Sequence, residues 1–265
     1  MNSSDLALLD TITDATADHS GRVVVAGSHG GLYAATLASR AGIRAVILND
    51  AGVGFDEAGV AGVLAAAQVG MAAAAADCMS CEIGRAADCL DQGTISRANS
   101  VAEGLGLHPG MLVSEAVALL EKAPPPSGQM AKLEETRREI TIQPDGPSLV
   151  LVDSASLVRA EDAGRIVVTG SHGGLVGNDP RRGFKAAARV AVFNDAGIGK
   201  NRAAVSRLPA LDPMGVAGVA VSHTTARIGD ATSVYETGVI STVNDTAARL
   251  GASPGTPLRD WLATL

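Results

Sequence analysis

The chain has 265 residues, of which 46% are hydrophobic, and this is enough for one large domain or two ordinary ones with a buried core. Its net charge of −7 provides no basic surface for a polyanion, and only 2% of its residues are aromatic, so few side chains can stack on bases. These values argue against nucleic acid and anionic membrane surfaces as partners.

Apolar runs of strand length alternate with stretches of helix length in the first part of the chain. Strands are predicted at residues 6–10, 22–27, 45–50 and 70–77. Helices are predicted at about residues 32–41 and up to about residue 67, and an amphipathic segment follows at residues 95–107. Near-continuous apolar strands separated by helices are typical of a parallel sheet that is covered on both faces.

Residues 123–148 form a predicted linker. Three consecutive prolines make a stiff spacer, the charged residues that come after them suit a solvated helix, and residues 139–142 favour an added strand. The sequence Pro-Asp-Gly-Pro at residues 144–147 then predicts a turn.

After the linker the sequence repeats. The hexamer Gly-Ser-His-Gly-Gly-Leu of residues 27–32 recurs at residues 170–175, and after a two-residue insertion Asn-Asp-Ala-Gly recurs as well. We therefore predict an internally duplicated α/β protein. Residues 1–122 and 149–265 are expected to form two doubly wound units with mainly parallel sheets, related by a pseudo-twofold axis.

The N-terminus and the cysteines indicate the compartment. The first twenty residues are acidic and lack a basic segment followed by an apolar one, so they do not resemble a secretory signal. Cys78, Cys81 and Cys89 form one odd-numbered cluster, unlike a secreted disulfide framework. We expect a cytoplasmic protein, either a monomer or a homo-oligomer. The apolar residues 60–76 are predicted to be a buried helix and strand, because the matching residues of the second repeat carry charges and prolines.

Two kinds of turn are predicted at the carboxyl ends of the strands, where open parallel sheets bind ligands. They are the Ser-His-Gly-Gly turns, residues 28–31 and 171–174, and the Asn-Asp-Ala-Gly turns, residues 49–52 and 194–197. Their glycines allow close backbone approach, and the helix N-termini after them offer N–H groups to an anion. The residues expected to bind substrate are Gly30, Gly31, Asn49, Asp50, Ser171, Gly173, Gly174, Asn194, Asp195, Lys200, His223 and Arg227.

The histidines of the first kind of turn carry the functional prediction. Turn geometry does not require an imidazole, yet His29 and His172 occupy matching positions. We therefore expect both to act as general acid and base, either at one cleft between the units or at two related ones. Cys78 or Ser28 is the candidate nucleophile, beside backbone N–H groups suited to an oxyanion. The predicted reaction is hydrolysis or ring opening at a C–N bond of a small amide or cyclic amide.

Two other functions and a structural role stay open. In a metal-dependent hydrolase or lyase, a divalent metal would be held by Cys78 and Cys81 with His29 and Asp50, or by residues of the second repeat (His172, Asp195 and His223). In a non-catalytic module, phosphate or another small anion would bind around Lys200, which ends a fragment resembling a P-loop.

The structural alternative is that the turns only cap helices, as Ser, Asn and Asp commonly do. Where the repeats differ in charge, Lys200, Arg202 and Arg227 would make the second unit the side that holds an anion, such as a substrate carboxylate. The substrate is therefore expected to be a small polar or anionic molecule.

Overall fold

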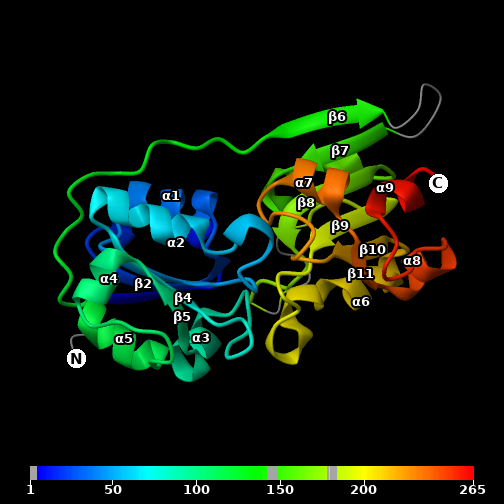
Figure 1. The fold of residues 1–265 in the computed structure, drawn as a ribbon. Helices are drawn as coiled ribbons and strands as arrows, with labels where there is room; N and C mark the ends of the chain where they lie inside the picture. Colours follow the sequence, from blue (N-terminus) through cyan, green and yellow to red (C-terminus); the bar gives the residue numbers. More distant parts are fainter. Residues whose placement is uncertain (1–4, 142–147, 178, 180–183) are drawn as a thin grey trace.

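The chain folds into two α/β units that lie side by side, each built around one sheet (Figure 1). The computed structural model describes residues 5–141, 148–177, 179 and 184–265. The first sheet comes from residues before the predicted linker, and the second from residues after position 136.

The first sheet has five strands in sequence order. The first four run parallel, and the fifth is antiparallel to the fourth. The strands are β1 (Leu6–Leu9), β2 (Val23–His29), β3 (Ala45–Asn49), β4 (Ala72–Ala76) and β5 (Ile95–Ala98). One face is covered by α1 (Leu32–Arg40) and α2 (Ala61–Ala65), the other by α3 (Ala86–Gln92), α4 (Ser100–Gly104) and α5 (Val113–Leu120) (Figure 1).

The second sheet has six strands, in the order β11-β10-β9-β8-β7-β6. Strands β7 to β10 run parallel, and β11 and β6 are antiparallel to their neighbours at the two edges. The strands are β6 (Arg137–Thr141), β7 (Ser148–Val152), β8 (Ile166–His172), β9 (Val190–Asn194), β10 (Ala217–Val221) and β11 (Ile240–Val243). The helices are α6 (Arg207–Leu211), α7 (Ala231–Thr237), α8 (Asp245–Arg249) and α9 (Leu258–Leu262).

The two sheets share a strand order of four parallel strands followed by an antiparallel one, which confirms an α/β fold with mainly parallel sheets. The common origin of the units stays a prediction. They differ in two places. The linker strand β6 extends only the second sheet, and the described residues between β8 and β9 contain no helix in the position of α1.

The long apolar run of the first unit is buried, as the sequence predicts. It contains α2 and β4, and all five alanines of β4 are inaccessible to solvent. A strand with both faces buried is what a sheet between two helix layers requires. The longest helix of the described chain, α1, has nine residues, and none of the described helices is both long and apolar enough to cross a bilayer.

The linker is extended, so the helix predicted for its charged segment is wrong. Its main-chain N–H groups find partners elsewhere: Ser127 donates to the carbonyl of Val69, and Met130 donates to Ser39 Oγ at 2.9 Å. The predicted added strand does form, two residues earlier than expected, as β6. The linker thus crosses the outside of α1 and joins the second sheet (Figure 1). The turn predicted at residues 144–147 lies outside the described residues.

The units meet where their Asn-Asp-Ala-Gly turns approach each other. A Cβ at Gly52 would lie 2.9 Å from the Cα of Gly197, and one at Gly197 would lie 3.0 Å from the Cα of Gly52. Both glycines also have positive φ, 72° and 79°. Glycine is therefore required at both positions, for close approach and for backbone conformation.

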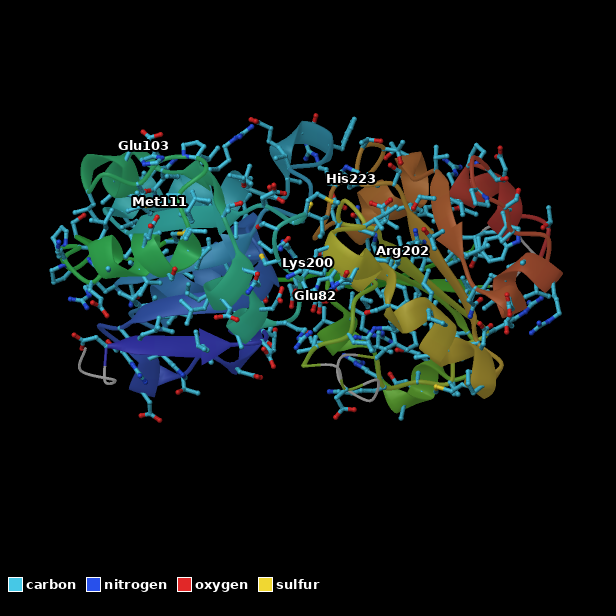
Figure 2. The ribbon with its side chains drawn as sticks, turned by 90° about the horizontal axis from the view of Figure 1, so that it is seen from below. Glu82, Glu103, Met111, Lys200, Arg202 and His223 are labelled. Atoms are coloured by element: carbon cyan, nitrogen blue, oxygen red, sulfur yellow. The ribbon has the colours of Figure 1, made fainter. Side chains whose placement is uncertain are left out.

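Backbone hydrogen bonds lock this junction in a reciprocal way. The Phe55 N–H donates to the carbonyl of His223 at 2.7 Å, and the Lys200 N–H donates to the carbonyl of Cys78 at 2.8 Å. The Lys200 ammonium also pairs with Asp88 of the first unit at 2.9 Å, and Figure 2 shows this lysine at the junction. Each unit thus closes a turn of the other.

A buried asparagine ties the antiparallel fifth strand to the core of each unit. Asn99 Nδ2 donates to the carbonyls of Val63 and Met71, and its Oδ1 accepts the N–H groups of Ala73 and Ala102. Asn244 makes the corresponding four bonds in the second unit. One side chain therefore satisfies four main-chain groups that would otherwise be buried without partners.

We predict that Asn99→Ala and Asn244→Ala each lower the free energy of unfolding by about 3 kcal/mol, because buried donors and acceptors lose their partners. Chemical denaturation measures this, and Ser100→Ala, at the exposed neighbouring position, serves as the control. A change below about 1 kcal/mol in both asparagine variants would contradict the assigned hydrogen bonds.

Candidate functional site

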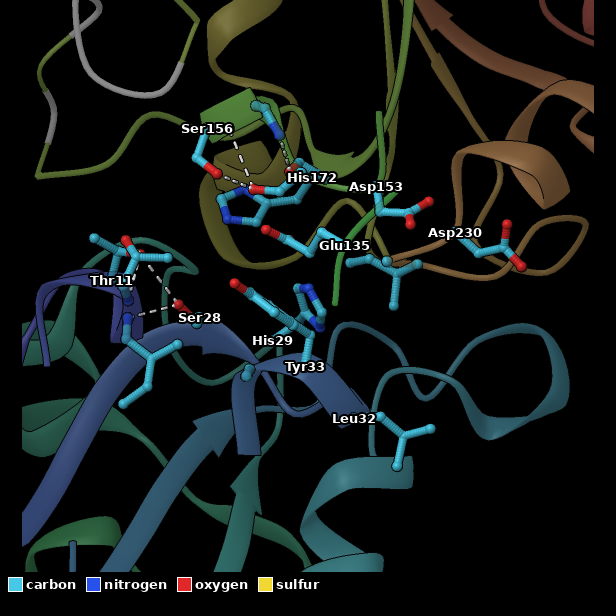
Figure 3. A pocket seen from close by; sticks show the side chains of 18 of the residues that line it. Thr11, Ser28, His29, Leu32, Tyr33, Glu135, Asp153, Ser156, His172 and Asp230 are labelled. Carbon is cyan, nitrogen blue, oxygen red and sulfur yellow. Dashed lines mark hydrogen bonds between the residues drawn. The ribbon is translucent and has the colours of Figure 1, made fainter. Parts of the chain in front are cut away.

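A cavity of about 850 Å³ lies between the two units. Both Ser-His-Gly-Gly turns line it: Ser28 and His29 at the end of β2, and Ser171 and His172 at the end of β8. Figure 3 shows the two imidazoles coming from the facing units, with Glu135 of the linker projecting between them. The structure therefore places the two predicted histidines at one cleft.

The serines of these turns bind backbone. Ser28 Oγ accepts the Ile12 N–H at 2.9 Å, and Ser171 Oγ accepts the Ala155 N–H at 2.9 Å. Ser28 thereby holds the loop after β1 against the cavity, and Ser171 holds the loop after β7. Because no hydrogen bond between Ser28 and an imidazole occurs among the described residues, no base is in place to activate its hydroxyl.

The histidines have a defined tautomer. The Gly31 N–H donates to Nδ1 of His29 at 3.1 Å, and the Gly174 N–H donates to Nδ1 of His172 at 3.1 Å. An imidazole nitrogen that accepts a hydrogen bond carries no proton, so the proton of each neutral ring lies on Nε2. The turn glycines are needed here, since a Cβ at Gly31 would lie 2.7 Å from this Nδ1.

Burial keeps both rings neutral. Loss of solvation lowers the pKa of His29 to about 4. For His172, burial is the main cause, and repulsion from Arg207 and from the protonated form of His29 adds to it, so that the pKa falls to about 3. Both side chains are only partly exposed, and the surface they keep faces the cavity. At neutral pH each ring therefore acts as an Nε2–H donor and has no free lone pair with which to act as a base.

Glu135 is a titratable group that the sequence did not single out. Burial, together with the charge of Asp153, raises the pKa of its carboxyl group to about 7, although hydrogen bonds from Tyr33 and Ser154 act in the opposite direction. Tyr33 comes from the first turn of α1 and also lines the cavity. A carboxyl group with a pKa near 7 can take up and release a proton at physiological pH.

Two cations at the cavity were also missed. Arg207, at the start of α6, is 3% exposed, donates to the Gly174 carbonyl at 2.8 Å and lies 6.0 Å from the ring centre of Phe193. Burial lowers its pKa to about 10. Lys185 is exposed and lines the same cavity. Both lie in segments where the two repeats diverge, so the comparison of repeats gave no signal for them.

The Asn-Asp-Ala-Gly turns do not line the cavity. Asn49 and Asn194 accept the N–H groups of the alanines two residues later, and both are buried. Asp50 Oδ1 accepts N–H groups from its own turn and from Cys78, and Asp195 Oδ1 does the same with His223. These four side chains thus hold the turns that form the junction.

The remaining predicted residues divide between the rim and the junction. Arg227 lines the cavity, where it pairs with Asp56. Cys78, His223 and Lys200 belong to the junction and are not among the cavity-lining residues. Burial and the charge of Asp50 raise the pKa of the Cys78 thiol to about 12, so this cysteine is protonated at neutral pH.

The backbone positions of the predicted site pack against their surroundings. Gly174 lines the cavity, whereas Gly30, Gly31 and Gly173 are not among its lining residues. A Cβ at Gly30 would come within 2.9 Å of Val63. These glycines shape the turns that carry the imidazoles.

One group of potential metal ligands occurs among the described residues. Oxygen and sulfur atoms of Asp50, Asp77 and Cys78 lie within 4.8 Å of one another, outside the cavity. Asp50 already accepts two backbone N–H groups, and a thiol must lose its proton to bind a metal. Metal binding stays a prediction, which elemental analysis of protein purified without chelators tests.

Comparison with known proteins adds no function. No family model matches the chain, and neither a curated protein nor a solved structure is significantly similar to it. A function for this chain therefore has to be inferred from the geometry and chemistry of its cavity.

The lowered pKa values of the histidines predict a pH-dependent stability. Between pH 6.5 and about 4, His29 and His172 are protonated in the unfolded chain but neutral in the folded protein. The free energy of unfolding therefore decreases as the pH falls through this range. Replacing either histidine by Asn should reduce the loss of stability between pH 7 and pH 4 by about 2 kcal/mol. Denaturation across this range measures the effect, with the exposed His108→Asn as control. Unchanged slopes would contradict the neutral buried state.

Proposed function

We propose that the protein is a hydrolase that cleaves a C–N bond of a small amide or cyclic amide in the cavity between its units. One observation carries the proposal: two neutral imidazoles and a carboxyl group with a pKa near 7 line the same cavity. Hydrogen-bond donors that face a carbonyl oxygen, together with a nearby base, are what addition of water to an amide requires.

In this proposal Glu135 is the general base. Its carboxylate takes a proton from a water molecule while the water oxygen forms a bond to the amide carbon. The carbonyl π electrons move to oxygen, and the resulting oxyanion accepts the Nε2–H of His29. A neutral imidazole suits this role, because its Nε2–H can donate a hydrogen bond to the oxyanion while the ring itself stays uncharged. The assignment differs from the acid–base role that the sequence predicts for the histidines.

The second half of the reaction returns the proton. The tetrahedral intermediate collapses, the C–N bond breaks, and the leaving nitrogen takes the proton that Glu135 received. The products are a carboxylic acid and an amine or ammonia, or an open-chain amino acid from a cyclic amide. Tyr33, which hydrogen-bonds Glu135, orients the carboxyl group in both steps.

Ser28 and Cys78 fit a nucleophilic role less well. The Ser28 oxygen is engaged with the Ile12 N–H, and the Cys78 thiol is protonated and outside the cavity. Activated water is therefore the attacking group in the proposal. The alternative in which an anion binds around Lys200 also loses support, because the ammonium group of this lysine already forms an ion pair with Asp88 at the junction.

We also infer that the two units arose by duplication. The support is that both repeats make the same local bonds: serine to a loop N–H, histidine Nδ1 to the second glycine, and asparagine to four backbone groups. These bonds recur between residues at matching positions of the two sequences. A pseudo-twofold axis through the cavity would relate them.

Replacing Glu135 by Gln should lower kcat by about 10²- to 10⁴-fold, because the amide cannot take the proton from water. In the wild type, kcat/KM should rise with pH around a midpoint near pH 7, since the ionised carboxylate is the active form. The assay follows ammonia release or ring opening over a panel of small primary amides, cyclic amides and imides. The exposed Glu103→Gln is the control. A Glu135→Gln variant with wild-type turnover and pH profile would refute the role of the base.

Two replacements of His29 separate its two nitrogens. Gln can place an N–H near the position of Nε2, whereas Asn can accept the Gly31 N–H but cannot reach the oxyanion. We expect His29→Asn to lower kcat by about 10²- to 10³-fold and His29→Gln to retain more activity. The pH midpoint near 7 should persist in both variants because Glu135 is intact. Equal activity of the two variants would argue against an Nε2–H donor.

A further inference from the structure

We propose that the substrate carries a carboxylate, which binds in the part of the cavity that His172, Arg207 and Lys185 line. This inference rests on the proposed function and names the substrate class: a small amide with an acidic group at its other end. It is carried by the separation of charge along the cavity.

The cationic end is built around Phe193 of β9. Arg207 lies over this ring, Phe184 packs against it at 5.6 Å between ring centres, and Lys185 comes directly after Phe184 in the chain. Among the residues that the structure describes, no carboxylate forms an ion pair with Lys185. A buried guanidinium that a backbone carbonyl holds, together with an exposed lysine that lines the same cavity, favours a carboxylate over a neutral group.

Three acids mark a different part of the cavity. A shallow pocket of about 310 Å³ adjoins the cavity and shares with it Tyr33, Glu135, Asp153 and Asp230, but neither Lys185 nor Arg207. Glu135, Asp153 and Asp230 therefore line one region, the shallow pocket, and the two cations line a second region of the cavity outside it. A substrate carboxylate would be repelled from the first region and attracted to the second.

The acids at the cavity are engaged in the fold. Asp153 Oδ2 accepts the N–H and hydroxyl of Thr136, and Asp230 Oδ1 accepts the Ser233 N–H. At the rim, Asp56 pairs with Arg227. Asp14 also lines the cavity, next to the Thr11 loop of the first unit. These contacts give Asp153, Asp230 and Asp56 partners within the fold.

His172 completes the carboxylate site as a neutral donor. Its Nε2–H can bind one carboxylate oxygen, while the charge comes from Arg207, which is near enough to lower the pKa of the imidazole. The amide then lies at the end that holds His29 and Glu135. Hydrolysis creates a second carboxylate there, beside Glu135 and Asp153, and repulsion between these groups promotes product release.

The experiment compares acids with neutral isosteres on the full chain. The probes are malonamate, succinamate and glutaramate, each paired with its diamide of equal length. Dissociation constants are measured by calorimetry on Glu135→Gln, which suppresses turnover. We expect at least one acid to bind tenfold or more tightly than its diamide. The preference should vanish in a Lys185→Gln or Arg207→Gln background and persist with the exposed Arg249→Gln.

Each outcome decides one proposal. Equal binding of acid and diamide in all three pairs, or no binding of either, overturns the carboxylate site, as does a preference that survives in the Lys185→Gln background. That variant keeps the test valid if Arg207→Gln fails to fold, because Lys185 is exposed. If Glu135-dependent hydrolysis is as fast for the diamides as for the acids, the proposed function stands and the carboxylate site is overturned. A Lys185-dependent preference without hydrolysis of any probe leaves the anion site standing and removes the amidase.

Discussion

The close contact between Gly52 and Gly197 is the constraint on which the rest of the structure depends. A Cβ atom at either glycine would lie about 3 Å from the Cα of the other, so only residues without side chains fit here. The reciprocal backbone hydrogen bonds of Phe55 and Lys200 then fix how the units face each other. This orientation brings the ends of β2 and β8 to one cavity. A bulkier residue at either glycine would separate the units and with them the two imidazoles.

Much of the fold was accessible from sequence because it depends on local patterns. The apolar runs of β2, β3 and β4 and the repeated turns after them predicted parallel sheets correctly, and the strand of the linker was displaced by only two residues. The linker helix was wrong because helix propensity in a charged segment competes with tertiary partners. Here the N–H groups bind Val69, Ser39 and β7, and these bonds outweigh the local preference.

The candidate site could be predicted only in part from the sequence, because its chemistry depends on tertiary neighbours as well as on repeated residues. His29 and His172 could be found because they recur at matching positions. The Asn-Asp-Ala-Gly turns recur equally well, yet the structure uses them at the junction, since repetition marks what both units need and does not distinguish binding from folding. Glu135 and Lys185 do not recur, and their chemistry depends on burial and neighbours that only the folded chain supplies.

The position of Glu135 on the linker makes the lining of the cavity unequal on its two sides. Two separate copies of a single unit would enclose a symmetric chamber with paired imidazoles but without this carboxyl group. A linker that passes over one side only removes the equivalence of the two units. In the proposed reaction the chain would therefore have one working centre with a fixed direction, in which one part of the cavity polarises the reacting group and another holds the remainder of the molecule.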